Sequence, residues 1–160
     1  MINISKVMDD KSPMLFKLLQ DISGQSVLVG IPEDKTGRKG DPVGNAQLMY
    51  IHTHGSEVNG IPARAVIEPA IEAPENKAVI SEELGESARA MMDDNIPASQ
   101  MHLKLAGMAG QNAARDWFTD PRNGWQENSE ETVKRKGSDM PLIDTEQLRK
   151  SIVYVVKDGK

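Results

Sequence analysis

A loop, a short helix and a strand follow one another between residues 137 and 156. Glycine and proline at the start of this stretch favour a loop. Asp144 or Thr145 can then cap a helical turn, because a short side-chain oxygen accepts from the free N–H groups there. From Ser151 the pattern changes to that of a strand, and both faces of the strand are apolar. The stretch therefore predicts a strand at residues 151–156 that is covered on both sides.

A second apolar run lies near the other end of the chain, at residues 27–31. Both runs are rich in β-branched residues, and both are too apolar to stand as exposed edges without inviting aggregation. We therefore expect them to pair in one sheet, so that the two ends of the sequence meet. Leu142, Ile143 and Leu148 are expected to pack beneath that sheet, against a helix at residues 12–22.

Helical periodicity and turn residues divide the rest of the chain. Glycine, proline and charged residues gather at residues 33–44 and 120–136, and both stretches are expected to be long mobile loops. The helical patterns cover residues 12–22, 45–53, 76–92 and 97–118. Together these elements predict a single α+β domain over residues 1–160, with a small, mainly antiparallel sheet and three or four helices.

The two longest helical patterns carry the residues we expect to be buried. Val79 and Leu84 in the first of them, and Met108 in the second, fall on the face predicted to point inward. Gly107 and Gly110 would each weaken a helix by about 1 kcal/mol relative to alanine. Their presence in mid-helix favours a close approach by another helix.

Composition limits the classes of function. The chain has 160 residues, of which 38% are hydrophobic and 4% aromatic, so we expect a lean, aliphatic and methionine-rich core. A net charge of −5 argues against a free-standing nucleic-acid binder. The absence of cysteine excludes disulfides, thiol catalysis and thiolate metal sites. The sequence shows neither an apolar leader nor an apolar run of membrane-spanning length, so we expect neither secretion nor membrane insertion.

Histidines provide the one candidate for metal or hydrolytic chemistry. His52 and His54 could chelate a metal from a strand, with Glu57 or Glu72 as further ligands, but in a helix they point about 200° apart. Because a helix is the pattern here, we expect no metal site. The nucleophile-elbow and P-loop motifs are also absent, so we expect no cofactor and no catalytic centre. His102 is isolated in the sequence and is expected to face solvent.

The remaining candidate residues are suited to protein contacts. Arg38 and Lys39 lie in a glycine-rich basic loop that could reach an acidic partner or a DNA phosphate. Arg64 and Arg149 sit beside apolar residues, and each is either a surface ion pair or an interface arginine. Trp125 lies in a polar loop and is a candidate for burial against a partner, whereas Trp117 ends a helix and is expected in the core. The interface candidates are thus Arg64, Trp125, Arg149, Arg38 and Lys39.

Three stretches, in order and at matching spacing, resemble a known family. Residues 50–55 (YIHTHG), 60–70 (GIPARAVIEPA) and 141–156 (PLIDTEQLRKSIVYVV) resemble the YIHEFG, IPARPFLRPA and PLIDTGQLRNSI segments of the tail-completion or neck proteins of long-tailed bacteriophages. Residues 27–32 are similar to the first strand of that family. Glu146 replaces the usual glycine, which should suit a helical turn. Ala65 and Val66 replace Pro–Phe, which changes what that segment packs against.

The resemblance implies a structural virion protein rather than an enzyme. It implies a ring at the phage head–tail junction, with six copies favoured and twelve possible, that completes the tail or neck for head joining. The implied partners are adjacent neck, tail-terminator or tail-tube proteins, with non-specific proximity to DNA in the lumen, after assembly in the host cytoplasm. Two alternatives stay open: a small metal-dependent hydrolase using His52 and His54, and a monomeric cytoplasmic protein-binding adaptor.

Overall fold

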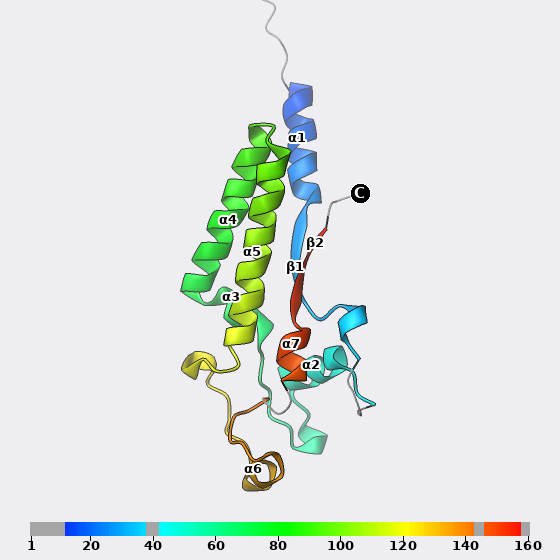
Figure 1. Cartoon of the computed structure of the whole chain (residues 1–160), viewed down its shortest axis with the longest axis vertical. Helices are drawn as coiled ribbons and strands as arrows, with labels where there is room; N and C mark the ends of the chain where they lie inside the picture. Colours follow the sequence, from blue (N-terminus) through cyan, green and yellow to red (C-terminus); the bar gives the residue numbers. More distant parts are fainter. Residues whose placement is uncertain (1–11, 38–41, 143–145, 158–160) are drawn as a thin grey trace, which may run out of the picture.

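A long antiparallel helical hairpin forms the spine of the molecule (Figure 1). The computed structural model describes residues 12–37, 42–142 and 146–157. Helix α4 spans Pro74–Met92 and helix α5 spans Ile96–Asp116. Asn95 caps α5, since its side-chain oxygen accepts from the N–H of Ala98 at 3.2 Å. A proline occupies the first turn of each helix, where a missing N–H costs nothing.

The two predicted strands pair, as the sequence analysis expected. Strand β1 (Ser26–Gly30) runs antiparallel to strand β2 (Val153–Lys157), with Val27 opposite Val156 and Val29 opposite Tyr154. Strand β2, near the end of the sequence, therefore pairs with β1, near its beginning, and the two ends of the sequence meet (Figure 1).

Helix α5 covers one face of this sheet through its glycines. A Cβ added to Gly107 would collide with Cδ2 and Cγ of the Tyr154 ring, and one added to Gly110 would lie 2.9 Å from Cγ2 of Val29. The expected close approach at these glycines is therefore present, but the partner is a sheet rather than a helix. Removing two side chains from α5 lets the strands lie directly against its backbone.

The opposite face of the sheet is not covered within the described residues. Leu28 lies directly opposite Val155, and these side chains are 46% and 40% exposed. The expectation that this strand is covered on both sides was wrong. Over the described ranges the sheet has two strands, and α5 packs on one side only, so the apolar character of the outer face reflects strand propensity rather than burial.

Shorter helices surround the spine. The remaining elements are α1 (Ser12–Gly24), α2 (Asn45–His54), α3 (Ile67–Glu72), α6 (Glu130–Lys136), α7 (Gln147–Ser151) and the 3₁₀ turns η1 (Glu33–Lys35), η2 (Glu57–Asn59) and η3 (Pro121–Asn123). The α+β class is confirmed, with more short helices than the sequence indicated. Within the described ranges, none of the helices has the length and apolar character that a bilayer crossing requires.

Both predicted loops contain ordered structure. In the first loop, Thr36 joins the segment before the loop to the start of α2. Its carbonyl accepts from the N–H of Asn45 at 2.6 Å, and its hydroxyl accepts from the N–H of Ala46 at 3.1 Å. The second, at residues 120–136, ends in the helix α6, and this corrects the expectation of a loop throughout. Ser129 caps α6 and Gly137 ends it in a left-handed conformation at φ 69°.

The main core lies where α2, α3, α7 and the last turns of α5 meet. Its buried members include four alanines and two aromatic side chains: Met49, Val66, Ala70, Ala73, Ala113, Ala114, Trp117, Phe118, Leu148 and Ile152. Leu148 and Leu142 pack in this cluster, whereas α1 lies at the other end of the molecule (Figure 1), so their expected packing against that helix was wrong. Ile143 lies outside the described residues.

Several burial predictions in the hairpin were also wrong. Val79, Leu84 and Met108 are exposed, because small side chains rather than long ones form the contact between α4 and α5. Ser87 and Ser99 share a buried hydrogen bond of 2.9 Å at that contact. Methionine is not the main filler either, since Met49 and Met91 are buried while five other described methionines are exposed. Alanine and serine allow the two backbones to approach closely instead.

Candidate interaction site

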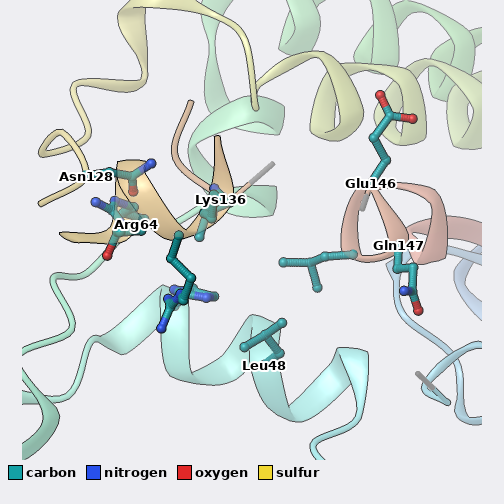
Figure 2. A pocket seen from close by; sticks show the side chains of 11 residues that line it. Leu48, Arg64, Asn128, Lys136, Glu146 and Gln147 are labelled. Carbon is teal, nitrogen blue, oxygen red and sulfur yellow. The ribbon is translucent and has the colours of Figure 1, made fainter. Parts of the chain in front are cut away.

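A polar hollow lies at the end of the molecule away from the hairpin turn. A cavity of about 200 Å³ adjoins a second of about 500 Å³, and both are lined by His52, Arg64, Asn128, Thr132 and Arg135. We call these two cavities the Arg64 pocket. In Figure 2, Arg64, Asn128 and Lys136 lie on one side, Glu146 and Gln147 on the other, and Leu48 on α2 between them.

Helix α2 reaches the pocket through a close contact at its end. Gly55 adopts φ 74°, and a Cβ there would lie 2.9 Å from the backbone of Ile61 and Ala63. Only glycine accommodates both that angle and that approach. The chain then turns back, and the N–H of Arg64 donates to the carbonyl of His52 at 2.5 Å. This contact places the Arg64 side chain beside the last turn of α2.

Arg64 is a buried cation held by backbone carbonyls. The residue is 7% exposed. Its guanidinium donates to the carbonyl of Gln126 from Nε at 3.1 Å and from Nη2 at 2.6 Å, and to that of Glu127 at 3.2 Å. Burial lowers the pKa of Arg64, but an arginine guanidinium does not lose its proton at neutral pH. Among the described residues it has no carboxylate partner, so the possibility of a surface ion pair at Arg64 does not hold.

Helix α6 supplies further positive charge to the rim. Glu130 and Glu131 lie in its first turn, and Lys134, Arg135 and Lys136 lie in its last. Each end thus carries the charge that interacts favourably with the helix dipole. Arg135 and Lys136 line the pocket. Lys136 also donates to the carbonyl of Met140 at 2.9 Å. The charges that stabilise this short helix therefore also make the pocket basic.

The start of α7 closes the pocket from the other side. Glu146 precedes the helix at φ 58°, a left-handed conformation that favours glycine. The expectation that glutamate suits this position better than glycine was wrong, because the residue lies before the helix and not in it. The Glu146 carboxylate forms an ion pair with Lys150, with 2.8 Å between Oε2 and Nζ. The N-cap expected at Asp144 or Thr145 lies outside the described residues.

The tryptophans point into the chain. Trp117 is buried, as expected, and Arg122 lies 5.8 Å from its ring centroid. Trp125 donates from Nε1 to the carbonyl of Ala65 at 3.1 Å and meets the Phe118 ring edge-on at 5.9 Å. Trp125 therefore packs beside the segment where the resembled family has Pro–Phe. Its contacts are with its own chain, whereas we expected it to be buried against a partner.

Arg149 does not line the pocket. Arg149 reaches Asp116 at 3.4 Å on an exposed surface, a contact worth less than about 1 kcal/mol. Arg38 and Lys39 lie outside the described residues. The structure thus brings one of the five candidates, Arg64, into the pocket, and it places Trp125 on the segment next to it.

The histidines do not form a chelating pair. His52 lines the Arg64 pocket, whereas His54 lines a separate hollow with Met49 and Tyr50. Tyr50 stacks on His54 with ring centroids 4.2 Å apart. His102, expected to face solvent, instead bonds Glu83 at 2.7 Å between α4 and α5. Across the described ranges no three metal-binding side chains gather at one place.

Sequence reasoning missed two residues of α5 that hold the end of the chain. Arg115 donates to the carbonyls of Ile152 at 3.0 Å and Lys150 at 3.2 Å. Gln111 accepts from the N–H of Tyr154 at 3.2 Å. These groups satisfy backbone atoms where α7 becomes β2. Their spacing of four residues on one helix face was the available signal, but nothing in the sequence says which backbone they meet.

A surface cluster fixes the turn after α5. Asp120 accepts from the backbone and side chain of Arg122, and these bonds lower the pKa of Asp120 to about 2. Arg122 also pairs with Glu75 at the start of α4. The cluster ties the segment leading to Trp125 back to the hairpin.

Comparison of the chain with models of known protein families, with curated proteins and with solved structures found no match.

Proposed function

We propose that this protein is a structural virion protein, a ring subunit that completes the neck or tail at the head–tail junction of a long-tailed phage. Its partners would be further copies of itself and the adjacent neck, tail-terminator or tail-tube proteins. The proposal favours six copies and needs no cofactor. Within this proposal the chain assembles from the host cytoplasm and acts in the virion.

The meeting of the three resembling stretches carries the proposal. His52 belongs to the first stretch, Arg64 to the second and Gln147 to the third, and all three line the Arg64 pocket. Gln147 lies 83 residues beyond Arg64 in the sequence, so its meeting with the other two is a property of the fold and not of local order. A family resemblance that consists of three short stretches gains support when residues from all three line the same pocket.

The hydrolase alternative has less support from the geometry. It needs two histidines that share a metal, and His52 and His54 line different hollows. The adaptor alternative needs a groove for a helix or strand. The Arg64 pocket is instead two adjoining hollows, lined by the fixed guanidinium of Arg64 and by both polar and apolar side chains.

The test of the proposed function uses the phage that encodes the chain. Purified virions should contain the protein by mass spectrometry. Deletion of its gene should yield filled heads and tails that fail to join, as seen by electron microscopy. A plasmid copy should restore joined particles, and a copy with His52→Gln and His54→Gln should restore them equally well. Size-exclusion chromatography with light scattering would measure the oligomer that forms.

Three results would contradict the proposal. Absence of the protein from virions, together with a monomer in solution, would favour the adaptor. Failure of the double histidine variant to restore particles, with stoichiometric metal in the parent, would favour the hydrolase. Normal particles without the gene would remove the assembly role altogether.

A further inference from the structure

The lining of the Arg64 pocket carries three cations, Arg64, Arg135 and Lys136, and two carboxylates, Glu127 and Glu146. Neither Arg64 nor Arg135 forms an ion pair among the described residues. Glu146 lines the pocket but pairs with Lys150 outside it. A buried guanidinium without a carboxylate is costly, and a negative group placed beside it recovers part of that cost. The chemistry of the pocket is therefore that of a carboxylate receptor.

The lining of the pocket is also partly apolar. Leu48, Leu142 and Leu148 line it together with the cations. Leu148 is buried, and Leu48 and Leu142 are half-buried against the main core. A fitting ligand would therefore carry negative charge beside apolar side chains, which describes a protein segment better than a free anion.

The turn between α4 and α5 has the complementary composition. Asp93 and Asp94 are exposed there, and within the described residues neither carboxylate forms an ion pair. Met92 and Ile96 flank them and are 62% and 41% exposed. The turn thus presents two carboxylates between two apolar side chains at the tip of a rigid hairpin.

A single chain cannot bring these two places together. The turn and the pocket lie at opposite ends of α5, a helix of 21 residues, which is about 31 Å long. Figure 1 shows the hairpin turn at one end of the molecule and α6 at the other. A contact between them must join two molecules through different surfaces, and such head-to-tail contacts generate rings when the rotation closes.

We propose that the Arg64 pocket receives the α4–α5 turn of a second copy, with Asp93 or Asp94 facing Arg64 and Arg135. The inference rests on the proposed function and adds to it the two surfaces that the ring would use. Met92 and Ile96 of one copy would lie over the leucines of the next. The contact is heterologous, so each subunit uses its turn once and its pocket once.

Disulfide trapping tests the contact directly, since the chain has no cysteine of its own. Met92→Cys on one chain and Thr132→Cys on another leave the proposed charges intact. A disulfide requires Cα atoms within about 7 Å, so the mixed pair should cross-link at least about tenfold faster than Glu82→Cys with Thr132→Cys. Equal rates for the two pairs would overturn the proposal.

Charge exchange in the same assay tests the pairing of carboxylate with guanidinium. Arg135→Glu on the Thr132→Cys chain should slow cross-linking at least about tenfold, and Asp93→Lys on the Met92→Cys chain should restore much of the loss. Asp93 is the better choice for exchange because Asp94 has φ 55°. The matched control Lys104→Glu, an exposed charge reversal on α5, should leave the rate unchanged. No slowing by Arg135→Glu, or no restoration, would overturn the pairing.

Inorganic phosphate and virion composition provide two further tests of the contact. Binding of inorganic phosphate at the pocket, with no accelerated cross-link, would assign the pocket to phosphate and overturn the proposal. Virions that contain a chain carrying both cysteines but no intermolecular disulfide would overturn the contact alone. Absence of the chain from virions would overturn the proposed function, while a rapid cross-link in solution would still support the contact.

Discussion

Arg64 joins two segments that lie 62 residues apart in the sequence. Its guanidinium bridges the carbonyls of Gln126 and Glu127, and in doing so fixes the segment that carries Trp125. A planar group with several fixed donors suits this task, and a lysine ammonium does not, because it is a point charge on a flexible stem. The same residue therefore organises its surroundings and charges the pocket.

Replacement of Arg64 should expose this structural role. Arg64→Met leaves two carbonyls without their donors and should cost about 2–3 kcal/mol of unfolding free energy. Arg64→Lys should retain one of the contacts and cost less. The matched control Arg135→Met removes an exposed charge from the same pocket and should change stability by less than about 0.5 kcal/mol. Urea unfolding monitored by tryptophan fluorescence measures all three, and equal midpoints for Arg64→Met and Arg135→Met would contradict the role.

At the scale of the element, the packing of α5 depends on two positions without a side chain, Gly107 and Gly110. Its two mid-helix glycines give the sheet a surface to lie on, at positions where any side chain would collide with Tyr154 or Val29. Glycine disfavours a helix, so the packing must repay that cost. By contrast, Gly85 in α4 has only the end of the Arg89 side chain nearby, at 3.7 Å.

A pair of glycine substitutions separates packing from propensity. Gly107→Ala should gain about 1 kcal/mol of helix propensity but lose about 1–3 kcal/mol by overpacking against Tyr154, with a net loss of stability. Gly85→Ala makes the same chemical change where there is space, and should raise the unfolding free energy by about 0.5–1 kcal/mol. Thermal melts followed by circular dichroism compare them, and a gain from both would show that the sheet does not press on α5.

The elements differ in how far the sequence predicts them. The strands and both long helices follow from period and from turn residues, which are local signals. Helix α6 also had its signals, Ser129 at the start and Gly137 at the end, but its charge suggested a solvated loop. The left-handed Glu146 could not be foreseen, because a backbone angle set by tertiary contacts has no local pattern in a single sequence.

The candidate site was predicted in part. Arg64 was identified from its place in a motif, but its partners are carbonyls, and backbone atoms leave no signature in a sequence. Arg135 fell in the stretch that was expected to be a loop, and its place on the pocket rim depends on how α6 folds back. Val79 and Leu84 fit the helical period, but they are exposed because α4 contacts α5 through small residues such as Ser87 and Ser99. The apolar pattern alone does not reveal this choice of contact.

For the whole molecule, the sheet has one inner and one outer face. Ile152, immediately before β2, is fully buried, whereas Val155 within the strand is 40% exposed. The main core lies at one end of α5, and the sheet extends from it along the hairpin (Figure 1). Stability should therefore depend strongly on which side of β2 a change falls.

Two substitutions to aspartate test that asymmetry. Ile152→Asp places a charge in the core and should cost more than about 3 kcal/mol. Val155→Asp puts the same charge on the outer face and should cost about 1 kcal/mol, mainly through strand propensity. Denaturant melts of the two variants give the comparison. A Val155→Asp variant that proves the less stable of the two would mean that the outer face, and not the inner one, is covered.

The pairing of β1 with β2 also sets when the protein can fold during its synthesis. Ser26 pairs with Lys157, so the first strand waits for more than a hundred further residues before its partner exists. At about 5–20 residues per second the ribosome needs roughly 6 to 26 seconds for that stretch. Any chain that stops before Val153 lacks the second strand, and its first strand stays unpaired and open to chaperones and proteases. The native pairing of the two strands can therefore form only after synthesis has passed Lys157.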